Sequence, residues 1–437
     1  MDSYILDWAN LLLRWLHVIT AIAWVGSSFY FVFLDSSLTP PVDEDLKRQG
    51  VSGELWAVHG GGFYHPVKFN VSPPKLPEHL HWFYWESYTT WLSGFALLTV
   101  SYLWNANIYL VNPANPLMST PTAIAAALAF LVVFWLLYDG ICRIFGHWDK
   151  GDAIVGALVL VLVCIAAYVA CHIFPGQAAF LLMGAMLATS MSANVFFWII
   201  PGQRTVVADL KAGRPVDPIH GKRGKQRSVH NTYFTLPVLF AMLSNHYGWL
   251  YNRPDNWLVL IVMMFAGAAI RQFFVMRHGY KLGRHAHPWK YAAVGIVALL
   301  AAAVWLRPVD QPAAAGAAVD LKPVGQVVMQ GEAADAAASP SAATAPAPAT
   351  PAAAAAPGSF AHVQTLVQQH CVVCHNSQGL AQKNVKLDSS SEIQTHAQQI
   401  YAQVVQLRKM PFGNPGALTE AERNSFKQWF ESGAPVQ

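Results

Sequence analysis

The chain has 437 residues, of which 54% are hydrophobic and only 12% are charged, with a net charge of +4 at pH 7. So little charge over this length excludes an ordinary soluble protein and indicates membrane spans. The sequence does not indicate nucleic-acid binding either. The Lys and Arg residues cluster in loops between apolar stretches, and the orientation of a membrane protein accounts for basic loops of this kind.

Eight apolar stretches have the length that a helix needs to cross a bilayer. We therefore expect an all-α fold in which residues 1–307 form an integral membrane domain, a polytopic eight-helix transmembrane bundle. The spans are predicted at residues 11–34, 82–104, 122–145, 153–173, 178–200, 232–251, 256–276 and 289–307. Arg14, Glu86, Asp139 and Arg271 fall inside these spans, and such charges should face the bundle interior or a wet cavity rather than lipid.

Basic residues alternate between the loops. Loops 35–81, 202–231 and 277–288 carry several Lys and Arg residues, whereas 105–121 and 174–177 carry neither. The positive-inside rule therefore predicts a multi-pass protein of the bacterial inner membrane, with the basic loops in the cytoplasm and both termini on the periplasmic side.

The C-terminal region contains a haem attachment motif, Cys371-Val-Val-Cys374-His375. In a C-x-x-C-H box the two thiols bind one haem c covalently and the histidine ligates the iron. Met410 is the only methionine after residue 359, and it is predicted as the second axial ligand. A zinc half-site is the alternative, but the second Cys/His pair of a tetrahedral site is missing here.

The composition separates this motif from the membrane domain. Residues 308–358 are dominated by Ala and Pro and are predicted to be a flexible linker. Residues 359–437 are predicted to be a small all-α cytochrome c domain, with helices before the box, over about 393–409 and from Thr419. Because c-type haem is attached outside the bacterial inner membrane, the motif independently predicts the same orientation as the loop charges.

Several histidines of the membrane domain are candidates for a haem b, which a helical bundle holds with a pair of histidines from facing helices. His17, His172 and His246 fall toward the outer side, whereas His81 and His230 could form an inner pair. A relay is expected because electrons cannot cross about 30 Å of hydrocarbon in one step. The alternative is that these are hydrogen-bonded histidines without iron.

Two cytoplasmic segments are rich in polar and aromatic residues. Residues 56–68 contain His59-Gly-Gly-Gly62, whose backbone could approach an anion. Residues 224–233 contain Lys225, Gln226 and Arg227, which could bind a planar anionic heterocycle. The alternative interpretations are a glycine turn and an ordinary basic loop. No G-x-G-x-x-G, Walker A or G-x-S-x-G sequence is present, so nucleotide-dependent and hydrolase chemistry are not indicated.

Nearly the whole chain resembles the bacterial membrane-bound, cytochrome c-coupled urate oxidases. The similarity is carried by four stretches of the membrane domain and by the haem box. The stretches are Arg14-Trp-Leu-His17-Val-Ile-Thr-Ala-Ile-Ala-Trp24-Val-Gly, Trp56-Ala-Val-His59-Gly-Gly-Gly-Phe-Tyr, Asn194-Val-Phe-Phe-Trp-Ile-Ile-Pro-Gly-Gln, and Gly224-Lys-Gln-Arg-Ser-Val-His230-Asn-Thr-Tyr-Phe-Thr-Leu-Pro with Ser244-Asn-His246-Tyr.

The resemblance implies an oxidoreductase of purine degradation that oxidises urate to 5-hydroxyisourate. Electrons would leave through the fused haem toward cytochrome c oxidase or a soluble cytochrome, without obligatory formation of hydrogen peroxide. The reaction needs a base, for which His59, His65, His81 and His230 are candidates. The competing interpretations are a non-enzymatic cytochrome subunit that conducts electrons from a quinol or a partner dehydrogenase, and a transporter with a fused redox sensor.

Overall fold

The computed structural model of this mostly helical chain describes residues 2–70, 72–112, 118–251, 253–307, 356, 358–372, 375, 385–406, 408, 410 and 418–436. Nearly all of the predicted linker and the predicted haem ligand Cys374 lie outside these residues.

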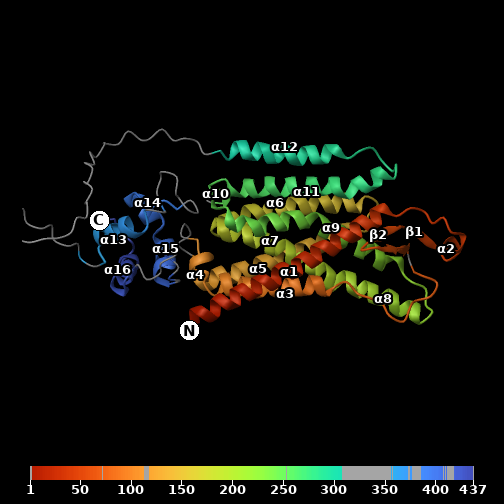
Figure 1. The fold of residues 1–437 in the computed structure, drawn as a ribbon, viewed down its shortest axis with the longest axis horizontal. Helices are drawn as coiled ribbons and strands as arrows, with labels where there is room; N and C mark the ends of the chain where they lie inside the picture. The colour runs from red at the N-terminus through yellow and green to blue at the C-terminus, as the bar shows by residue number, and fades with distance from the viewer. Residues whose placement is uncertain are drawn as a thin grey trace, which may run out of the picture.

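The longest helices of the first 307 residues run side by side along the long axis of the molecule (Figure 1). Their packing buries one continuous apolar core that is centred on α7, whose residues are largely buried. The helices are α1 (Asp2–Ser37), α3 (Trp85–Leu98), α5 (Thr120–Phe145), α6 (Gly151–Ile173), α7 (Gly176–Asn194), α9 (Pro218–Leu243), α11 (Asn256–Lys281) and α12 (Trp289–Trp305).

Five helical segments are long and apolar enough to cross a membrane, by length and composition. They are Trp8–Ser37, Thr120–Phe145, Gly151–Ile173, Gly176–Lys211 and Asn256–Lys281. Helices also lie at the other three predicted positions. Of these, α12 is apolar but shorter, and α3 and α9 are not among the five. The total of eight spans stays a prediction.

Helix α9 differs from its predicted bounds at both ends. It begins in the expected basic loop because Pro218 occupies the first turn and Asp217 caps it, accepting a hydrogen bond from the Ile219 N–H at 2.9 Å. The segment 224–232 is therefore helical, and its buried face carries polar residues, including Arg227 and Asn231. The helix ends at Leu243, and the predicted span continues as two short elements, η3 (Ser244–His246) and α10 (Gly248–Tyr251).

Short elements connect the long helices. Two of them are π-helical turns that continue α3 and α7 without a break. The elements are η1 (Thr99–Leu103), α4 (Ala106–Tyr109), η2 (Val195–Ile199) and α8 (Ile200–Lys211).

The first basic loop contains the only strands among the described residues. After α2 (Glu44–Arg48), β1 (Val51–Glu54) pairs antiparallel with β4 (Val67–Phe69). Between them β2 (Ala57–His59) and β3 (Gly62–Tyr64) form a hairpin in the register Val58 opposite Phe63. Gly60 and Gly61 have φ of +58° and +81°, the left-handed values that a tight two-residue turn requires. The glycine-turn interpretation of this segment is therefore confirmed.

The C-terminal residues form a separate helical unit with its own core around Phe426 and Trp429. Its helices are α13 (Phe360–His370), α14 (Ser390–Thr395), α15 (Ala397–Ile400) and α16 (Glu420–Glu431), with a π-helical turn, η5 (Tyr401–Gln406). The expected helix over 393–409 is thus divided between several elements. Thr419 and Glu422 form the predicted capping box of α16.

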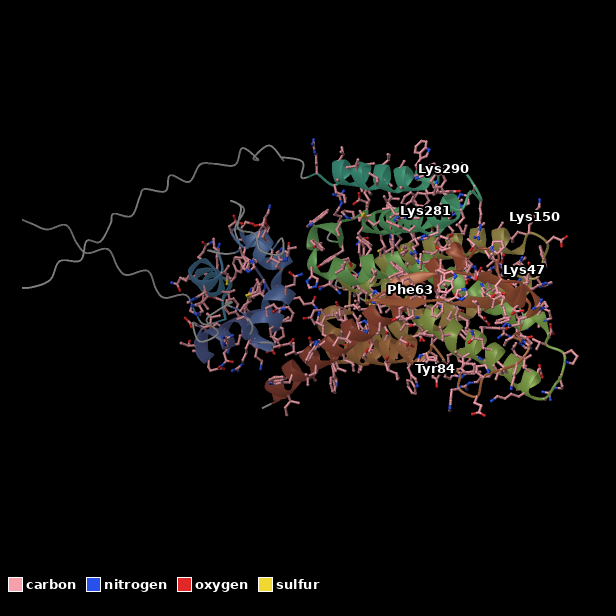
Figure 2. All side chains as sticks on the ribbon, turned by 45° about the vertical axis from the view of Figure 1, so that its right-hand side comes forward. Lys47, Phe63, Tyr84, Lys150, Lys281 and Lys290 are labelled. Atoms are coloured by element: carbon pink, nitrogen blue, oxygen red, sulfur yellow. The ribbon has the colours of Figure 1, made fainter. Side chains whose placement is uncertain are left out.

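Different elements lie at the two ends of the helical bundle. The C-terminal helices lie at the end that carries α4, and Gln398 Nε2 donates to the Asn107 carbonyl at 2.9 Å (Figure 1). The strands and α8 lie at the other end, where Lys47, Lys150, Lys281 and Lys290 extend outward (Figure 2). The basic loops therefore share one end of the bundle.

Candidate functional site

A buried carboxylate, Asp139 in α5, is held by three side chains. Its Oδ1 accepts hydrogen bonds from Arg227 Nη2 in α9 and Trp198 Nε1 in η2, both at 2.7 Å. Its Oδ2 accepts from Arg143 Nε at 2.6 Å. Because one carboxylate faces two guanidinium groups that are always protonated, the group carries one net positive charge.

Arg227 is the buried cation of this group, with 3% of its surface exposed. Its guanidinium carbon lies 5.0 Å from the ring centroid of Tyr138 and 5.1 Å from that of Trp198, so the two aromatic rings flank the charge. Its Nη1 has no hydrogen-bond partner within the described residues. A buried N–H donor is therefore available to an acceptor that the chain itself does not supply.

A second chain of hydrogen bonds adjoins the first through Tyr138. The Tyr138 oxygen accepts from Asn194 Nδ2 at 2.9 Å and lies 2.8 Å from His230 Nδ1. The Tyr138 hydroxyl and His230 Nδ1 therefore form one hydrogen bond, in which the tautomer of His230 decides which atom donates.

The orientation of the Asn194 amide follows from its neighbour. Asn231 Nδ2 donates to the Met191 carbonyl at 3.0 Å, which directs Asn231 Oδ1 toward Asn194 Nδ2, also at 3.0 Å. Asn194 Oδ1 is consequently a buried acceptor without a partner in the described part of the chain. We define the polar cluster as Tyr138, Asp139, Arg143, Asn194, Trp198, Arg227, His230 and Asn231.

A surface pocket of about 300 Å³ lies over the turn between α5 and α6. Gln226 contacts two residues of its lining. Gln226 Nε2 donates a hydrogen bond to Asp152 Oδ1 at 2.7 Å. Gln226 Oε1 packs so closely on Gly146 that a side chain there would come within 2.7 Å of it. Gln226 thus contacts two residues of the pocket lining and directly precedes Arg227 in α9. The pocket is lined by Gly146, Trp148, Asp149, Lys150, Gly151, Asp152 and Ala153.

The predicted substrate residues have three different environments. Lys225 is exposed, Gln226 is half-buried at the pocket, and Arg227 is buried in the polar cluster. Of the predicted base candidates, His230 belongs to this cluster. His81 is exposed, and its ring packs edge-on against Phe83 with centroids 4.6 Å apart. The structure therefore gives His81 and His230 different neighbours.

The other two base candidates lie in the strand-containing loop. His59 is exposed at the end of β2. His65 Nε2 lies 2.6 Å from Glu54 Oε2, and its ring stacks on Trp56 with centroids 4.0 Å apart. The Val42 N–H, which donates to Glu54 Oε1 at 2.7 Å, and the His65 contact lower the pKa of the Glu54 carboxyl. Both oxygens of Glu54 are thus engaged within the loop.

The three predicted haem b ligands of the outer side differ in their exposure and hydrogen bonds. His17 Nδ1 lies 3.0 Å from the Thr90 carbonyl and 3.2 Å from Ser93 Oγ in α3, an arrangement that leaves Nε2 for another partner. His172 is exposed and bonds to the Tyr168 carbonyl of its own helix at 2.7 Å. His246 is exposed in η3. A haem b between any of them stays a prediction.

The predicted haem c ligands fall in the C-terminal unit, where the described residues fit this role. His375 Nδ1 donates to the Val385 carbonyl at 3.0 Å, which fixes the ring and leaves Nε2 for iron. Cys371 is buried in the core of the unit, against which Met410 also packs. The Met410 N–H donates to the Gln403 carbonyl at 3.2 Å. No cluster of three or more His, Cys, Asp or Glu residues suited to a metal ion occurs in the described ranges.

The model of the urate oxidase N-terminal family matches residues 3–307. The chain belongs to this family. The match covers the whole helical bundle, and with it the polar cluster and the pocket, and it ends before the C-terminal unit. A comparison with curated proteins and with solved structures found no match to this chain. Membership indicates an oxidoreductase with a urate-related role.

Six members of the polar cluster of this urate oxidase family domain were not predicted as site residues from the sequence: Tyr138, Asp139, Arg143, Asn194, Trp198 and Asn231. Asp139 carried a signal, because a carboxylate inside an apolar stretch calls for a buried partner. Asn194 and Trp198 lie in a stretch that carried the family resemblance. Tyr138 had no signal, because a tyrosine in an apolar helix is ordinarily part of the core.

Proposed function

We propose that the chain is a membrane-bound urate oxidase that converts urate to 5-hydroxyisourate at the polar cluster. Its electrons pass to a haem c in the C-terminal unit and then to cytochrome c oxidase or a soluble cytochrome. The observation that carries this proposal is two buried groups without a hydrogen-bond partner among the described residues, the Arg227 Nη1 donor and the Asn194 Oδ1 acceptor, within the domain that the family match covers. A simple electron conduit would need neither group.

The charges and hydrogen-bonding groups suit a urate monoanion. Its deprotonated edge accepts from Arg227, and a urate N–H can donate to Asn194. The ring faces of Tyr138 and Trp198 already flank the Arg227 guanidinium, so they give a planar heterocycle aromatic surfaces beside its charge partner. The pocket beside Gln226 is the proposed way in, with Gln226 and Asp152 at its border.

The reaction has a simple balance. A urate monoanion and one water give 5-hydroxyisourate, one proton and two electrons. The water adds at ring carbon C5, and oxygen gas is not consumed in this balance, so hydrogen peroxide need not form. In this proposal the Tyr138–His230 pair handles the proton, since the Tyr138 oxygen lies 2.8 Å from His230 Nδ1 and a proton can pass between them. His59, His65 and His81 are outside the cluster, so His230 is the favoured base.

Cys371, Cys374, His375 and Met410 would hold the haem c. A bound haem with histidine and methionine ligands accepts one electron at a time at a raised potential. The protein groups that prepare the site are the Val385 carbonyl, which orients His375, and the η5 backbone, which holds the Met410 segment. A haem b oriented by His17 is the proposed relay between the two ends.

For location, we propose the bacterial inner membrane, with membrane lipid around the bundle and with both termini and the cytochrome c domain on the periplasmic side. Five helices of spanning length and composition support a membrane protein. The shared end of the basic loops supports the orientation, because Lys and Arg favour the cytoplasmic side.

The test measures urate oxidation without oxygen. Purified holoprotein is mixed with urate under anaerobic conditions, and the urate absorbance and the reduced-haem spectrum are followed together. We expect both to change in the ratio of one urate to two reduced haems. An Arg227→Lys variant should react at least about 10-fold more slowly, because a point charge cannot replace the planar fork of Arg227.

The matched control is Arg214→Lys, which changes an exposed arginine paired with Asp209 outside the polar cluster and should retain most of the rate. Chemical reduction of the haem in each variant checks that the acceptor is intact. Wild-type protein whose haem is reduced by dithionite but not by urate would contradict the proposed function.

A further inference from the structure

A second buried arginine lies away from the polar cluster. Arg271 belongs to α11, at its contact with α1 and α9, and has 4% of its surface exposed. Its guanidinium carbon lies 3.8 Å from the ring centroid of Phe29 in α1. On the side of α9, Tyr233 donates a hydrogen bond to Gln272, the next residue of α11. Arg271 is therefore enclosed by three helices and faces inward rather than toward lipid.

Two of the three guanidinium nitrogens of Arg271 have no hydrogen-bond partner among the described residues. They are Nε and Nη2, and both are buried. These two nitrogens share one edge of the planar guanidinium, the edge with which arginine binds a carboxylate through two parallel N–H donors. This edge of Arg271 therefore suits a bidentate acceptor.

The charge of Arg271 is also unbalanced. Arg227 is paired with Asp139, but no described carboxylate forms an ion pair with Arg271, whose electrostatic neighbour is the Tyr233 hydroxyl. Burying a guanidinium without a counter-charge is costly. Water could satisfy the N–H groups but would leave the charge uncompensated. An anion satisfies both requirements.

The aromatic ring determines how that anion can approach. Phe29 covers one face of the guanidinium, so a ligand reaches Nε and Nη2 in the guanidinium plane. A lipid phosphate is disfavoured, because the side chain is buried among helices rather than exposed to the bilayer.

We propose that the Nε–Nη2 edge of Arg271 is a second anion site, which binds a planar monoanion presenting two adjacent acceptor atoms. A carboxylate has this chemistry, and so does the deprotonated N–C–O edge of urate. The site is distinct from the polar cluster and does not depend on oxidation taking place there.

The test uses full-length holoprotein in nanodiscs with its haem reduced by dithionite, so that urate is bound but not consumed. Thermal unfolding is followed by tryptophan fluorescence while urate, benzoate or chloride is added. A ligand that binds only the folded state raises the midpoint as its concentration increases. The variants are Arg271→Gln, which removes the charge, and Arg271→Lys, which keeps the charge but loses the paired donors.

We expect benzoate, urate or both to raise the wild-type midpoint at concentrations at least about 10-fold lower than chloride requires. Arg271→Lys should need at least about 10-fold more ligand, and Arg271→Gln should lose the Arg271-dependent part of the response. The control, Arg253→Gln, removes an arginine that is already paired with Asp255 and should respond as wild type does.

A response to urate alone identifies the amidate edge of urate as the ligand, and a response to benzoate identifies the carboxylate class. Equal responses to chloride and the planar anions would overturn the proposal. So would the absence of any wild-type response, or a response that is undiminished in both Arg271 variants. If Arg271→Gln does not fold, the comparison of wild type with Arg271→Lys still decides the question.

Discussion

The polar cluster and the strand-containing loop each combine a carboxylate, a histidine and aromatic rings, but they satisfy their polar groups differently. In the loop, Glu54 accepts from the Val42 N–H and contacts His65, whose ring stacks on Trp56. In the cluster, both oxygens of Asp139 are also bonded, yet Arg227 Nη1 and Asn194 Oδ1 have no partner among the residues that the structure describes.

This difference separates the loop, whose polar groups are paired, from the cluster that we propose as a binding site. A buried polar atom that lacks a partner costs free energy, so a folded protein retains it where a ligand completes the bond. The loop is complete by itself and can hold its strands in register without a ligand. In the cluster, we propose that a ligand accepts a hydrogen bond from Arg227 Nη1 and donates one to Asn194 Oδ1.

The largest effect is expected from Asp139→Asn. This variant leaves Arg143 and Arg227 without a counter-charge, and removing one partner of a buried ion pair costs about 3–5 kcal/mol. The loss should appear as a lower unfolding midpoint of the membrane domain in detergent. Asp152→Asn is the matched control, because it removes an exposed carboxylate that holds only Gln226. Equal stability of the two variants would contradict the central place of Asp139.

The next effect is expected from Tyr138→Phe, which keeps the ring beside Arg227 and removes the hydroxyl. Loss of a group that transfers a proton lowers rates by about 100-fold or more, whereas loss of a hydrogen bond costs about 1 kcal/mol of stability. Urate-dependent haem reduction should therefore fall far more than stability does. The solvent deuterium isotope effect on the residual rate should also change. Loss of stability without loss of rate would make Tyr138 a structural residue only.

The length and position of the apolar stretches predicted much of the fold. Apolar stretches placed helices at all eight predicted positions, since an apolar segment of sufficient length has few alternatives to a helix in a bilayer. The bounds of α9 were wrong because its polar residues suggested a loop, whereas their spacing places Arg227 and Asn231 on one buried face. The strands of the first loop were not predicted either, because three- and four-residue strands leave little periodic signal.

The candidate site was predicted only in part. Arg227 and His230 were identified from their local sequence, and helical spacing places them one turn apart on α9. Tyr138, Asp139 and Asn194 come from α5 and α7, and only tertiary packing brings them to α9. A single sequence does not specify which helices face each other, so the partners of Arg227 could not be deduced from it. His59 and His65 were grouped with His230 by residue type alone.

A smaller effect is expected from His65→Gln. If the loop is structural, urate oxidation should stay within about two-fold of wild type, because the change touches no group of the polar cluster. The loop itself should become easier to cleave in limited proteolysis, because Glu54 loses its contact with the imidazole. His59→Gln, at the exposed end of β2, should change neither property. A large loss of urate oxidation in the His65 variant would indicate that the catalytic base is His65 in the loop rather than His230 in the polar cluster.

The smallest effect is a pH dependence confined to the loop. The Val42 N–H and His65 lower the pKa of Glu54 below its usual value of 4.5. Since a lowered pKa means that the folded loop favours the carboxylate, this stabilisation is fully present above pH 4.5 and is lost as pH falls through the folded-state pKa. Hydrogen exchange at the Val42 amide should therefore quicken, relative to its intrinsic rate, on acidification below about pH 4.5. Glu54→Gln keeps an acceptor for Val42 but should abolish this acid transition. If Glu54→Gln shows the same pH dependence of Val42 hydrogen exchange as wild type, groups other than Glu54 stabilise the loop. The comparison between the loop and the polar cluster would then be wrong.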